Sequence, residues 1–484
     1  MKIAISYPPL ESIKGTPLLS QNRQFQWFNE PTYIYPIVPA YAATMLYNDG
    51  FDVVWNDAIA EKWTYKQYID YYKKQKFNLV MIESKTPVIK MHWDIIKELK
   101  NICPSTIIVL VGDHVTALPK ESMENCPVDF ILTGGNYDFL LEKLCINIRD
   151  GFDENKLESG IWYRDNNKIC NTGSFVLNQN INDLPIINRD LTKWKLYSIN
   201  NGNYSRTPGT YTMVARDCWH HECSFCSWTT LYNKYLVRTP ESLLDEIDIL
   251  INKYGIKEIM DDSGAFPVGD WLKKFCEGMI KRGYNKKVVI DCNMRLSSLT
   301  LEDYKLMKEA GFRLILFGIE SANQLTLDRV NKKENIEEMI SSCKDAKKAG
   351  LSPHITLMFG YPWEDENMIN NSIALAKHLL KKGYASSLQA TLLIPYPGTP
   401  LYEGCKNNGL LLTNNYEDYD QRMPVIKTVV ETDKVIKAIQ SVYRIAFNPI
   451  FLIRKILNIK NISDIKYYMK SGKKVIGHLL DFKQ

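Results

Sequence analysis

Hydrophobic and polar positions follow an alternating strand–helix pattern along the first 150 residues. Short apolar runs predict five strands, at Lys2–Tyr7, Phe51–Trp55, Leu79–Glu83, Thr106–Val111 and Phe130–Leu132. Val38–Asn48 and Lys90–Asn101 have helical patterns between them. Strands that alternate with helices predict an α/β, Rossmann-like domain over residues 1–150, with a parallel sheet and ligands at the carboxyl ends of its strands.

The pattern changes further along the chain. Residues 151–207 are rich in Asn, Asp and Gly and indicate a connector. Strands and helices alternate again over residues 208–425, which predicts a partial (β/α)6 barrel. Its six strands are expected at Tyr211–Ala215, Glu258–Met260, Lys287–Cys292, Leu314–Gly318, His354–Phe359 and Leu388–Leu393. Residues 426–484 are predicted to form a helical, basic C-terminal region.

The composition narrows the function classes. The chain has 484 residues, 45% of them hydrophobic, and a net charge of +5, which suits two or three domains and does not indicate nucleic-acid binding. Pro8 and Pro9 interrupt the N-terminal apolar run, so we expect no signal peptide, and no apolar run is long enough to cross a bilayer. We therefore expect a cytoplasmic protein with mostly reduced thiols. Eight scattered cysteines are expected to be small buried residues: Cys103, Cys126, Cys145, Cys170, Cys276, Cys292, Cys343 and Cys405.

The other three cysteines lie within nine residues, directly after a predicted strand. Cys218, Cys223 and Cys226 are close enough for one loop to bring their thiolates onto a shared metal centre. Three ligands on a four-iron cluster leave one iron open, which can bind the amino and carboxylate groups of S-adenosylmethionine (SAM). A zinc site with His220 or His221 as fourth ligand is an alternative. A two-iron cluster with a distant fourth cysteine is another. The spacing favours the four-iron cluster and leaves the alternatives open.

The cysteine segment and the later strand ends resemble the radical SAM superfamily, whose pattern is C-x3-C-x-aromatic-C after the first barrel strand. Phe225 matches the aromatic position, whereas the first gap here has four residues. The resemblance implies that the three cysteines bind a [4Fe-4S] cluster that cleaves SAM to a 5′-deoxyadenosyl radical. It also implies SAM contacts at strand ends, namely Phe225, Asp261, Asp262, Ser263, Asn293, Arg295, Gly318, Glu320, Ser321 and Tyr361.

The first domain resembles the cobalamin-binding domains of the cobalamin-dependent branch of that superfamily. It has neither G-x-G-x-x-G nor a Walker lysine loop. The resemblance implies cobalamin contacts at Pro8, Ser84, Thr86, Gly112, Asp113, His114, Val115, Thr116, Gly134 and Gly135. No His follows the first strand, and His114 comes after a later strand, so we do not expect it to bind cobalt. The alternative is a degenerate domain that only supports the barrel.

The C-terminal region carries nine Lys or Arg and two Asp between Arg444 and Gln484, with recurring apolar residues. A basic amphipathic helix of this kind can lie on an acidic membrane surface. The commoner alternative is that its apolar face packs on the barrel. Peripheral membrane contact and a hydrophobic substrate are therefore hypotheses at this stage.

The resemblance implies a function in three versions. The first is cobalamin-dependent methyl transfer to an unactivated carbon of a small-molecule substrate. The second is radical oxidation or cyclisation without methyl transfer, and the third, from a different class, is an iron–sulfur electron-transfer or binding protein. We expect the first, with an external low-potential electron donor, because this domain pair is used most often for methylation in the family.

Overall fold

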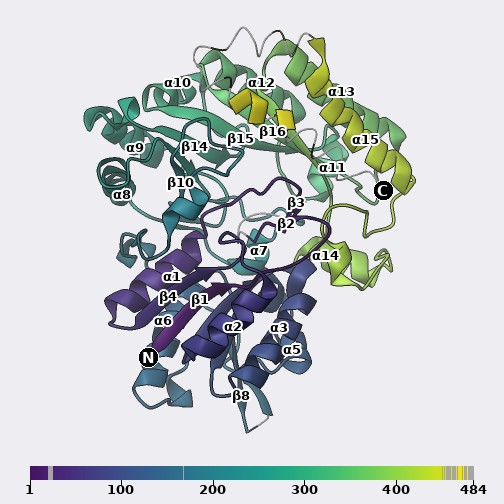
Figure 1. The fold of residues 1–484 in the computed structure, drawn as a ribbon. Coiled ribbons are helices and arrows are strands. Elements are labelled where there is room, and N and C mark those ends of the chain that lie inside the picture. The colour runs from purple at the N-terminus through teal and green to yellow at the C-terminus, as the bar shows by residue number, and fades with distance from the viewer. Residues whose placement is uncertain are drawn as a thin grey trace.

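A computed structural model describes residues 1–19, 25–166 and 168–449, together with residues 451, 453, 459, 465, 467–470, 472, 473 and 477. Two α/β units make up this part of the chain. In Figure 1 the N-terminal unit lies below and the barrel-like unit above, and the short β2–β3 hairpin (Thr16–Pro17 and Trp27–Phe28) lies between them. The carboxyl ends of the strands of both units are therefore placed where the two units meet.

The N-terminal unit is built on a seven-stranded sheet with the order β4-β1-β5-β6-β7-β8-β9. Its first five strands are parallel, and β8 and β9 add an antiparallel hairpin. The strands are β1 (Lys2–Tyr7), β4 (Asp52–Asp57), β5 (Leu79–Ser84), β6 (Ile107–Gly112), β7 (Phe130–Leu132), β8 (Ile161–Asp165) and β9 (Lys168–Asn171). The helices are α1 (Ile37–Asn48), α2 (Tyr65–Gln75), α3 (Ile89–Ile102), α4 (Asp113–Ala117), α5 (Pro119–Asn125) and α6 (Tyr137–Arg149). The strand order changes direction between β1 and β5, which is where such sheets bind ligands.

The second unit is a six-stranded parallel sheet whose order, β10-β13-β14-β15-β16-β17, follows the chain. β10 and β17 are its two edges, so the barrel is partial. The strands are β10 (Gly209–Thr212), β13 (Glu258–Asp261), β14 (Val289–Met294), β15 (Phe312–Glu320), β16 (Ser352–Phe359) and β17 (Ser387–Leu392), with a small pair β11 (Ala215–Arg216) and β12 (Leu236–Val237). The helices are α7 (Trp228–Leu231), α8 (Pro240–Asn252), α9 (Asp270–Lys281), α10 (Leu301–Glu309), α11 (Gln324–Arg329), α12 (Ile336–Lys348), α13 (Glu366–Lys382), α14 (Pro400–Asn407) and α15 (Thr432–Arg444).

The predicted fold class is confirmed, and the strand bounds differ mainly at their ends. Each predicted strand has a counterpart, because buried apolar runs in parallel sheets give a strong local signal. The connector is more structured than its composition suggests, since its hairpin β8–β9 extends the first sheet. The division of the chain at residues 150, 207 and 425 stays a prediction.

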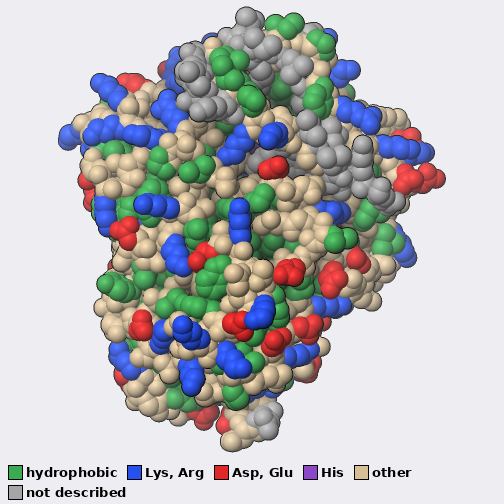
Figure 2. All heavy atoms as spheres, viewed as in Figure 1, with side chains coloured by type: hydrophobic (Ala, Val, Ile, Leu, Met, Phe, Trp, Pro, Cys, Tyr) green, Lys and Arg blue, Asp and Glu red, His purple; other side chains and the backbone are tan. Residues whose placement is uncertain are grey.

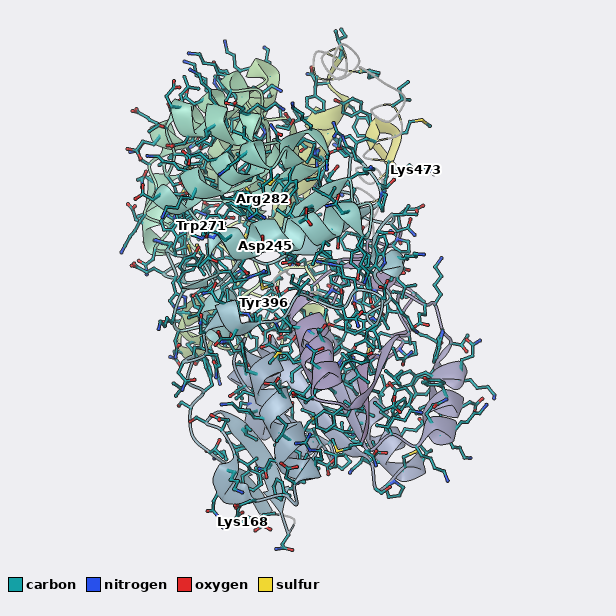
Figure 3. All side chains as sticks on the ribbon, turned by 90° about the vertical axis from the view of Figure 1, so that its left-hand side faces the viewer. Lys168, Asp245, Trp271, Arg282, Tyr396 and Lys473 are labelled. Atoms are coloured by element: carbon teal, nitrogen blue, oxygen red, sulfur yellow. The ribbon has the colours of Figure 1, made fainter. Side chains whose placement is uncertain are left out.

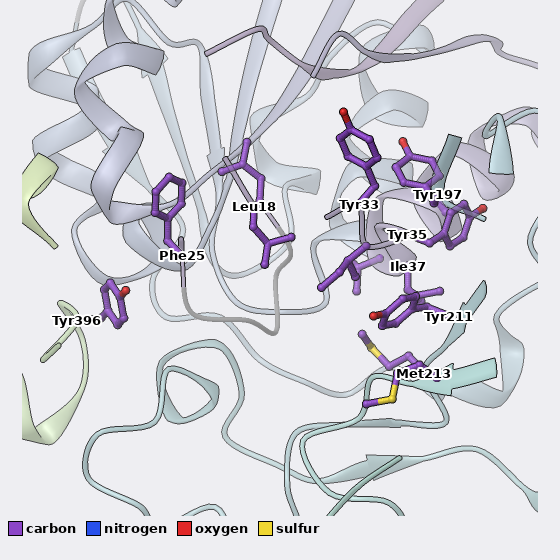
Figure 4. Packing of buried hydrophobic residues seen from close by; sticks show 14 of the residues in the cluster. Leu18, Phe25, Tyr33, Tyr35, Ile37, Tyr197, Tyr211, Met213 and Tyr396 are labelled. Carbon is purple, nitrogen blue, oxygen red and sulfur yellow. The ribbon is translucent and has the colours of Figure 1, made fainter. Parts of the chain in front are cut away.

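The two units share one buried core. Figure 4 shows aromatic side chains from both meeting at the interface, with Tyr35 and Tyr197 near Tyr211 and Met213 of the barrel. The rings of Tyr35 and Tyr197 make an edge contact with centroids 5.3 Å apart. Tyr396 lies at the level of this interface in the side view of Figure 3. This packing holds the carboxyl edges of the two sheets against each other.

A buried ion pair also joins the units. The guanidinium of Arg216, on β11, donates to both carboxylate oxygens of Asp138 and, at 2.8 Å, to Asn136 Oδ1. Both charged side chains are almost completely buried. Because Asp138 lies on α6 and Arg216 directly precedes the cysteine loop, this pair ties that loop to the N-terminal unit.

The surface carries a mixture of charges. On the face drawn in Figure 2, acidic and basic side chains are interspersed, in keeping with the small net charge. Within the described ranges, the chain contains no helix that is both long and apolar enough to span a bilayer. Most of the predicted basic tail beyond residue 450 lies outside the described residues.

Candidate functional site: the cysteine loop and the facing sheet edges

The three clustered cysteines lie on the loop between β11 and α7. Two non-glycine residues of this loop, Asp217 and His221, have positive φ angles of 79° and 52°. The buried Asp217 carboxyl group lies against His221 Nδ1. These two left-handed residues tighten the loop around Cys218, which accommodates the longer first gap of the cysteine pattern.

The cysteine loop is pinned to the barrel by backbone contacts. Gly264 N donates to Asp217 O at 3.2 Å, and Ser224 N donates to Val330 O at 3.0 Å. A Cβ atom on Gly264 would lie 2.8 Å from Asp217 O, so only glycine permits this approach. The loop is thus fixed against the ends of β13 and α11.

The three thiols line one cavity of about 200 Å³. Among the described residues, no three His, Cys, Asp or Glu side chains are arranged to hold a single metal ion. Burial raises the pKa of Cys218, Cys223 and Cys226. Buried thiolates need a positive partner, and a polynuclear iron cluster, which is larger than one ion, supplies one. The donor set of three thiols and no fourth cysteine fits a cluster with one open iron.

Several predicted SAM-binding residues lie in this cavity. Phe225, Asn293, Arg295, Gly318 and Glu320 line it together with the thiols. Asn293 Oδ1 and Arg295 Nε are buried and have no hydrogen-bond partner within the described part of the chain. Unpaired buried polar atoms are costly. The cavity therefore presents one acceptor and one donor for a polar ligand.

Other predicted residues lie beside the cavity and support it. Asp261 accepts from Thr212 Oγ1 at 2.8 Å, from Val214 N at 3.0 Å and from Ser263 Oγ at 2.5 Å. Burial raises the pKa of Asp261 to about 6. This aspartate therefore clamps the strand that leads into the cysteine loop. Asp262 is buried next to it, and its backbone N–H donates to Thr212 O at 2.8 Å.

The last two predicted SAM residues lie after β15 and β16. Ser321 Oγ donates to Glu364 Oε1 at 2.6 Å. The Tyr361 hydroxyl is buried and has no hydrogen-bond partner among the described residues. Neither residue lines the cysteine cavity.

Lys332 is a cavity residue that the sequence patterns did not reveal. Its buried ammonium lies 3.3 Å from Glu320 Oε1 and 3.8 Å from Glu334 Oε2. Burial alone would lower the pKa of Lys332, but the carboxylates of Glu334 and Glu320 raise it. Arg295 donates to the backbone oxygen of Lys332 at 2.7 Å. No local motif surrounds Lys332, so only the packing of the loop after α11 brings it to the cluster site.

The Glu320–Lys332 pair packs closely over Gly318 of β15. A Cβ atom on Gly318 would lie 2.2 Å from Glu320 Oε1 and 3.0 Å from Lys332 Nζ. Glu320 has a φ of 65° at an irregularity of the β15–β16 register. The strained backbone turns the Glu320 carboxylate toward Lys332 and the cavity.

At the facing edge of the first sheet, the predicted cobalamin residues come together at the ends of β5, β6 and β7. Ser84 Oγ lies 2.6 Å from His92 Nδ1, and Thr86 Oγ1 lies 3.2 Å from His114 Nδ1. Gly134 N donates to Thr116 Oγ1 at 3.0 Å. Ser84, Thr86 and Thr116 therefore have partners, whereas the buried Nε2 of His92 has no hydrogen-bond partner among the described residues. Pro8, Asp113 and Val115 are buried at the same edge, where Asp113 pairs with Lys85 at 3.0 Å.

The predicted glycines at this edge permit close packing within the protein. A Cβ on Gly112 would lie 2.1 Å from Ser84 O. Cβ atoms on Gly134 and Gly135 would meet the rings of Phe175 and Tyr232. These three glycines bring β6, the connector and α7 together beside the proposed ligand edge.

A carboxyl and two phenols, absent from the sequence prediction, lie at the change in strand order. Tyr7 donates to Glu83, and Tyr137 donates to Glu83 Oε1 at 3.1 Å. Burial raises the pKa of Glu83 to about 7. Glu83 is a single acidic residue inside an apolar strand, and no sequence motif identifies such a residue as part of a site.

Comparison with known proteins identifies the family. The family model described as "Radical SAM superfamily" matches residues 213–376. A relative from Pyrococcus horikoshii, the uncharacterized methyltransferase PH0819, is 30% identical over 410 residues, covering 81% of this chain and 83% of the relative. The chain belongs to the radical SAM superfamily. The predicted resemblance is confirmed, and this radical SAM protein is an enzyme whose family uses a [4Fe-4S] cluster and SAM.

Other similarities extend over both units of this radical SAM protein. The anaerobic magnesium-protoporphyrin IX monomethyl ester cyclase of Cereibacter sphaeroides is 25% identical over 402 residues, covering 81% of this chain and 63% of the relative. Among solved structures, TsrM from Kitasatospora setae with cobalamin and a [4Fe-4S] cluster bound has a TM-score of 0.70 at 13% identity, covering 100% of each chain. OxsB with aqua-cobalamin and SAM bound also has a TM-score of 0.70, at 14% identity, covering 99% of this chain and 72% of that one. These structures share the fold of the whole chain.

Proposed function

We propose that the protein is a cobalamin-dependent radical SAM methyltransferase. The observation that carries this proposal is the agreement of the whole fold, N-terminal sheet included, with TsrM in its cobalamin- and cluster-bound form. The methyltransferase name of the Pyrococcus relative supports the reaction type. When bound, the cluster supplies the electron that cleaves SAM, and cobalamin carries a methyl group to the substrate.

The residues at the barrel edge have separate roles in this proposal. Cys218, Cys223 and Cys226 would hold the cluster. The unpaired Asn293 Oδ1 and Arg295 Nε would contact SAM, and Lys332 with Glu320 would orient its charged methionine end by ion pairing. Asp261 would fix the cysteine loop through the bonds it already makes.

Two features of the edge between the two units support a cobalamin ligand there. The sheet changes strand order between β1 and β5, the position at which a bound group is expected. Thr230, on α7, has a buried hydroxyl with no hydrogen-bond partner among the described residues. A Cβ on Gly398 would lie within 3 Å of both Thr230 and Ala117, so this hydroxyl is at the junction of the two units. The site residues Pro8, Ser84, Thr86, Gly112, Asp113, His114, Val115, Thr116, Gly134 and Gly135 are proposed as cobalamin contacts.

Two measurements on anaerobically reconstituted protein test the proposal. Reduced protein should convert SAM to 5′-deoxyadenosine, and the corrinoid should co-elute with the protein in gel filtration. Label from methyl-labelled SAM should then enter a small molecule of a cell extract. Retained corrinoid and 5′-deoxyadenosine without label transfer would contradict methylation and favour cyclisation, as the name of the Cereibacter relative suggests. Loss of corrinoid during gel filtration would contradict the cobalamin role.

We also propose a cytoplasmic location with peripheral membrane contact through the C-terminal region. The described side chains Phe447, Ile453, Ile465 and Met469 are exposed and apolar. They are interspersed with lysines, a pattern that suits an acidic lipid surface. Co-sedimentation with phosphatidylglycerol vesicles, lost on truncation after residue 444, is the expected result. Equal sedimentation of the truncated protein would contradict this role.

A further inference from the structure

A larger cavity lies at the opposite end of the barrel strands from the cysteines. Its volume is about 920 Å³. Its walls come from the amino ends of β14 to β17, from the segment 199–207 and from the described C-terminal residues 467, 468 and 470. Barrel strands of six to nine residues rise about 20–30 Å at about 3.3 Å per residue. The cavity is therefore separate from the SAM site.

The lining of this barrel-floor cavity is strongly basic. Among the described residues, seven cationic side chains and no Asp or Glu line it: Arg206, Lys257, Lys286, Lys308, Arg313, Lys347 and Lys470. Arg313 is paired with Asp291 at 2.5 Å and with Glu258 at 2.8 Å, both buried behind the wall. The two buried carboxylates behind this wall are thus already paired with Arg313.

Three of the lysines have no counter-charge within the described part of the chain. Lys257, Lys286 and Lys347 make no side-chain hydrogen bond or ion pair with another described residue. They come from three different segments, the turn before β13, the turn before β14 and the last turn of α12, yet line the same cavity. Tertiary packing has gathered them although like charges repel.

Two of the cations are also partly withdrawn from water. Lys347 is half-buried, and burial lowers its pKa with no carboxylate to oppose the effect. Burial likewise lowers the pKa of Lys470, whose Nζ donates to the carbonyls of Ile199 and Asn201 at 2.8 Å. A partly desolvated ammonium without an anion is unfavourable, so a bound anion would offset the cost.

We propose that the barrel-floor cavity binds a phosphorylated ligand through Lys257, Lys286 and Lys347. Lysine ammonium groups bind phosphate as point charges, and several cations around one cavity suit more than one phosphate charge. The volume lies at the upper end of the range for small-molecule pockets. Tyr467 and Tyr468 line one wall, and the ring of Tyr467 lies 5.6 Å from the Arg313 guanidinium. An organic group attached to the phosphates would pack against these rings.

Binding to the reconstituted holoenzyme tests the proposal. Isothermal titration would use pyrophosphate and ATP as soluble probes, with SAM at saturation so that the adenosine site is filled. A parallel arm would use vesicles of one part phosphatidylglycerol to three parts phosphatidylcholine against pure phosphatidylcholine. Binding of a soluble probe assigns a free phosphorylated ligand, and binding of the acidic vesicles alone assigns a lipid headgroup if Lys257→Gln and Lys347→Gln weaken it, because membrane contact by the exposed apolar side chains of the C-terminal region does not need these lysines. Either kind of binding should weaken as the salt concentration rises, because salt screens the charges.

Substitutions of the lining lysines test whether the probes bind in this cavity. Lys347→Gln and Lys257→Gln should each weaken binding by about tenfold or more, since each removes a charge-assisted contact. Lys344→Gln is the matched control, because Lys344 is on the same helix, is exposed and does not line the cavity. All three variants should retain 5′-deoxyadenosine formation, which reports intact folding. The proposal is overturned if no probe binds with a Kd below about 1 mM, or if Lys344→Gln weakens binding as much as Lys347→Gln.

Discussion

The two facing sheet edges differ in how their polar groups are used. At the barrel edge, Asn293 Oδ1 and Arg295 Nε are buried without hydrogen-bond partners within the described chain. At the edge of the N-terminal sheet, Ser84, Thr86 and Thr116 are paired with neighbouring side chains or backbone. The barrel edge is therefore preorganised for a charged ligand.

The N-terminal edge presents a different surface to its ligand. Because Ser84, Thr86 and Thr116 already have partners there, a ligand would bind mainly by shape and by exchanging a few existing hydrogen bonds. Glu83, whose pKa burial raises to about 7, is enclosed by Tyr7 and Tyr137. The difference between the two edges predicts that changes at the barrel edge affect cofactor binding and activity. Changes at the N-terminal edge and at the junction should mainly affect stability.

The largest effect is expected at the cysteine loop. Cys223→Ala should reduce bound iron and 5′-deoxyadenosine formation by more than about 100-fold, because a cluster ligand is lost. Iron analysis and chromatography of the nucleoside measure both. Cys343→Ala is the control, since Cys343 is a buried thiol on α12 outside the cavity. Equal iron content in both variants would contradict the role of the loop.

The ion pair at the junction should dominate stability. Arg216→Ala leaves Asp138 buried without its partner and should lower the free energy of unfolding by about 3–5 kcal/mol. Arg282→Ala, which breaks the exposed pair with Asp245 on α8 and α9 (Figure 3), should cost at most about 1 kcal/mol. Urea denaturation measures both values. Similar losses of unfolding free energy in the two variants would contradict a larger contribution of the junction pair to stability.

Glu83 should give the N-terminal edge a pH dependence. Its pKa of about 7 in the folded state exceeds the ordinary glutamate value of 4.5, so the unfolded chain releases the proton first as pH rises. Stability from this group is thus present below about pH 4.5 and lost as pH rises toward 7. Glu83→Gln should remove a decline of roughly 1–3 kcal/mol across that window. Unfolding midpoints measured from pH 5 to 8 should diverge, and parallel profiles for variant and wild type would contradict this.

The smallest effect is expected from the lysine beside the cluster. Lys332→Gln removes the ammonium between Glu320 and Glu334 and should weaken SAM binding by about tenfold, with iron content unchanged. Lys333→Gln is the matched control, because Lys333 is exposed and pairs only with the exposed Glu222 among described residues. Equilibrium dialysis with labelled SAM measures the difference. Equal affinity in the two variants would remove Lys332 from the SAM site.

The sequence by itself determined the order of strands and helices, the cysteine loop and the superfamily. Buried parallel strands are continuous apolar runs, and the cysteine spacing is a local property of ten or fewer residues, so both are visible along the chain. The positions of Phe225, Asn293, Arg295, Gly318 and Glu320 at one cavity followed from their places at strand ends, because parallel strands end at a common edge.

Only the tertiary structure decided which side chains meet. In the folded chain, Asp261 accepts hydrogen bonds from Thr212 and Ser263. Lys332 reaches the cysteine cavity from a loop that has no sequence motif. Arg216 and Asp138 join the two units by an ion pair. The tertiary structure also gathered uncompensated lysines at the barrel floor. The paired residues lie from 2 residues apart, as Asp261 and Ser263 do, to 78 apart, as Arg216 and Asp138 do. Which side chains pair depends on packing, and no local periodicity in the sequence encodes it.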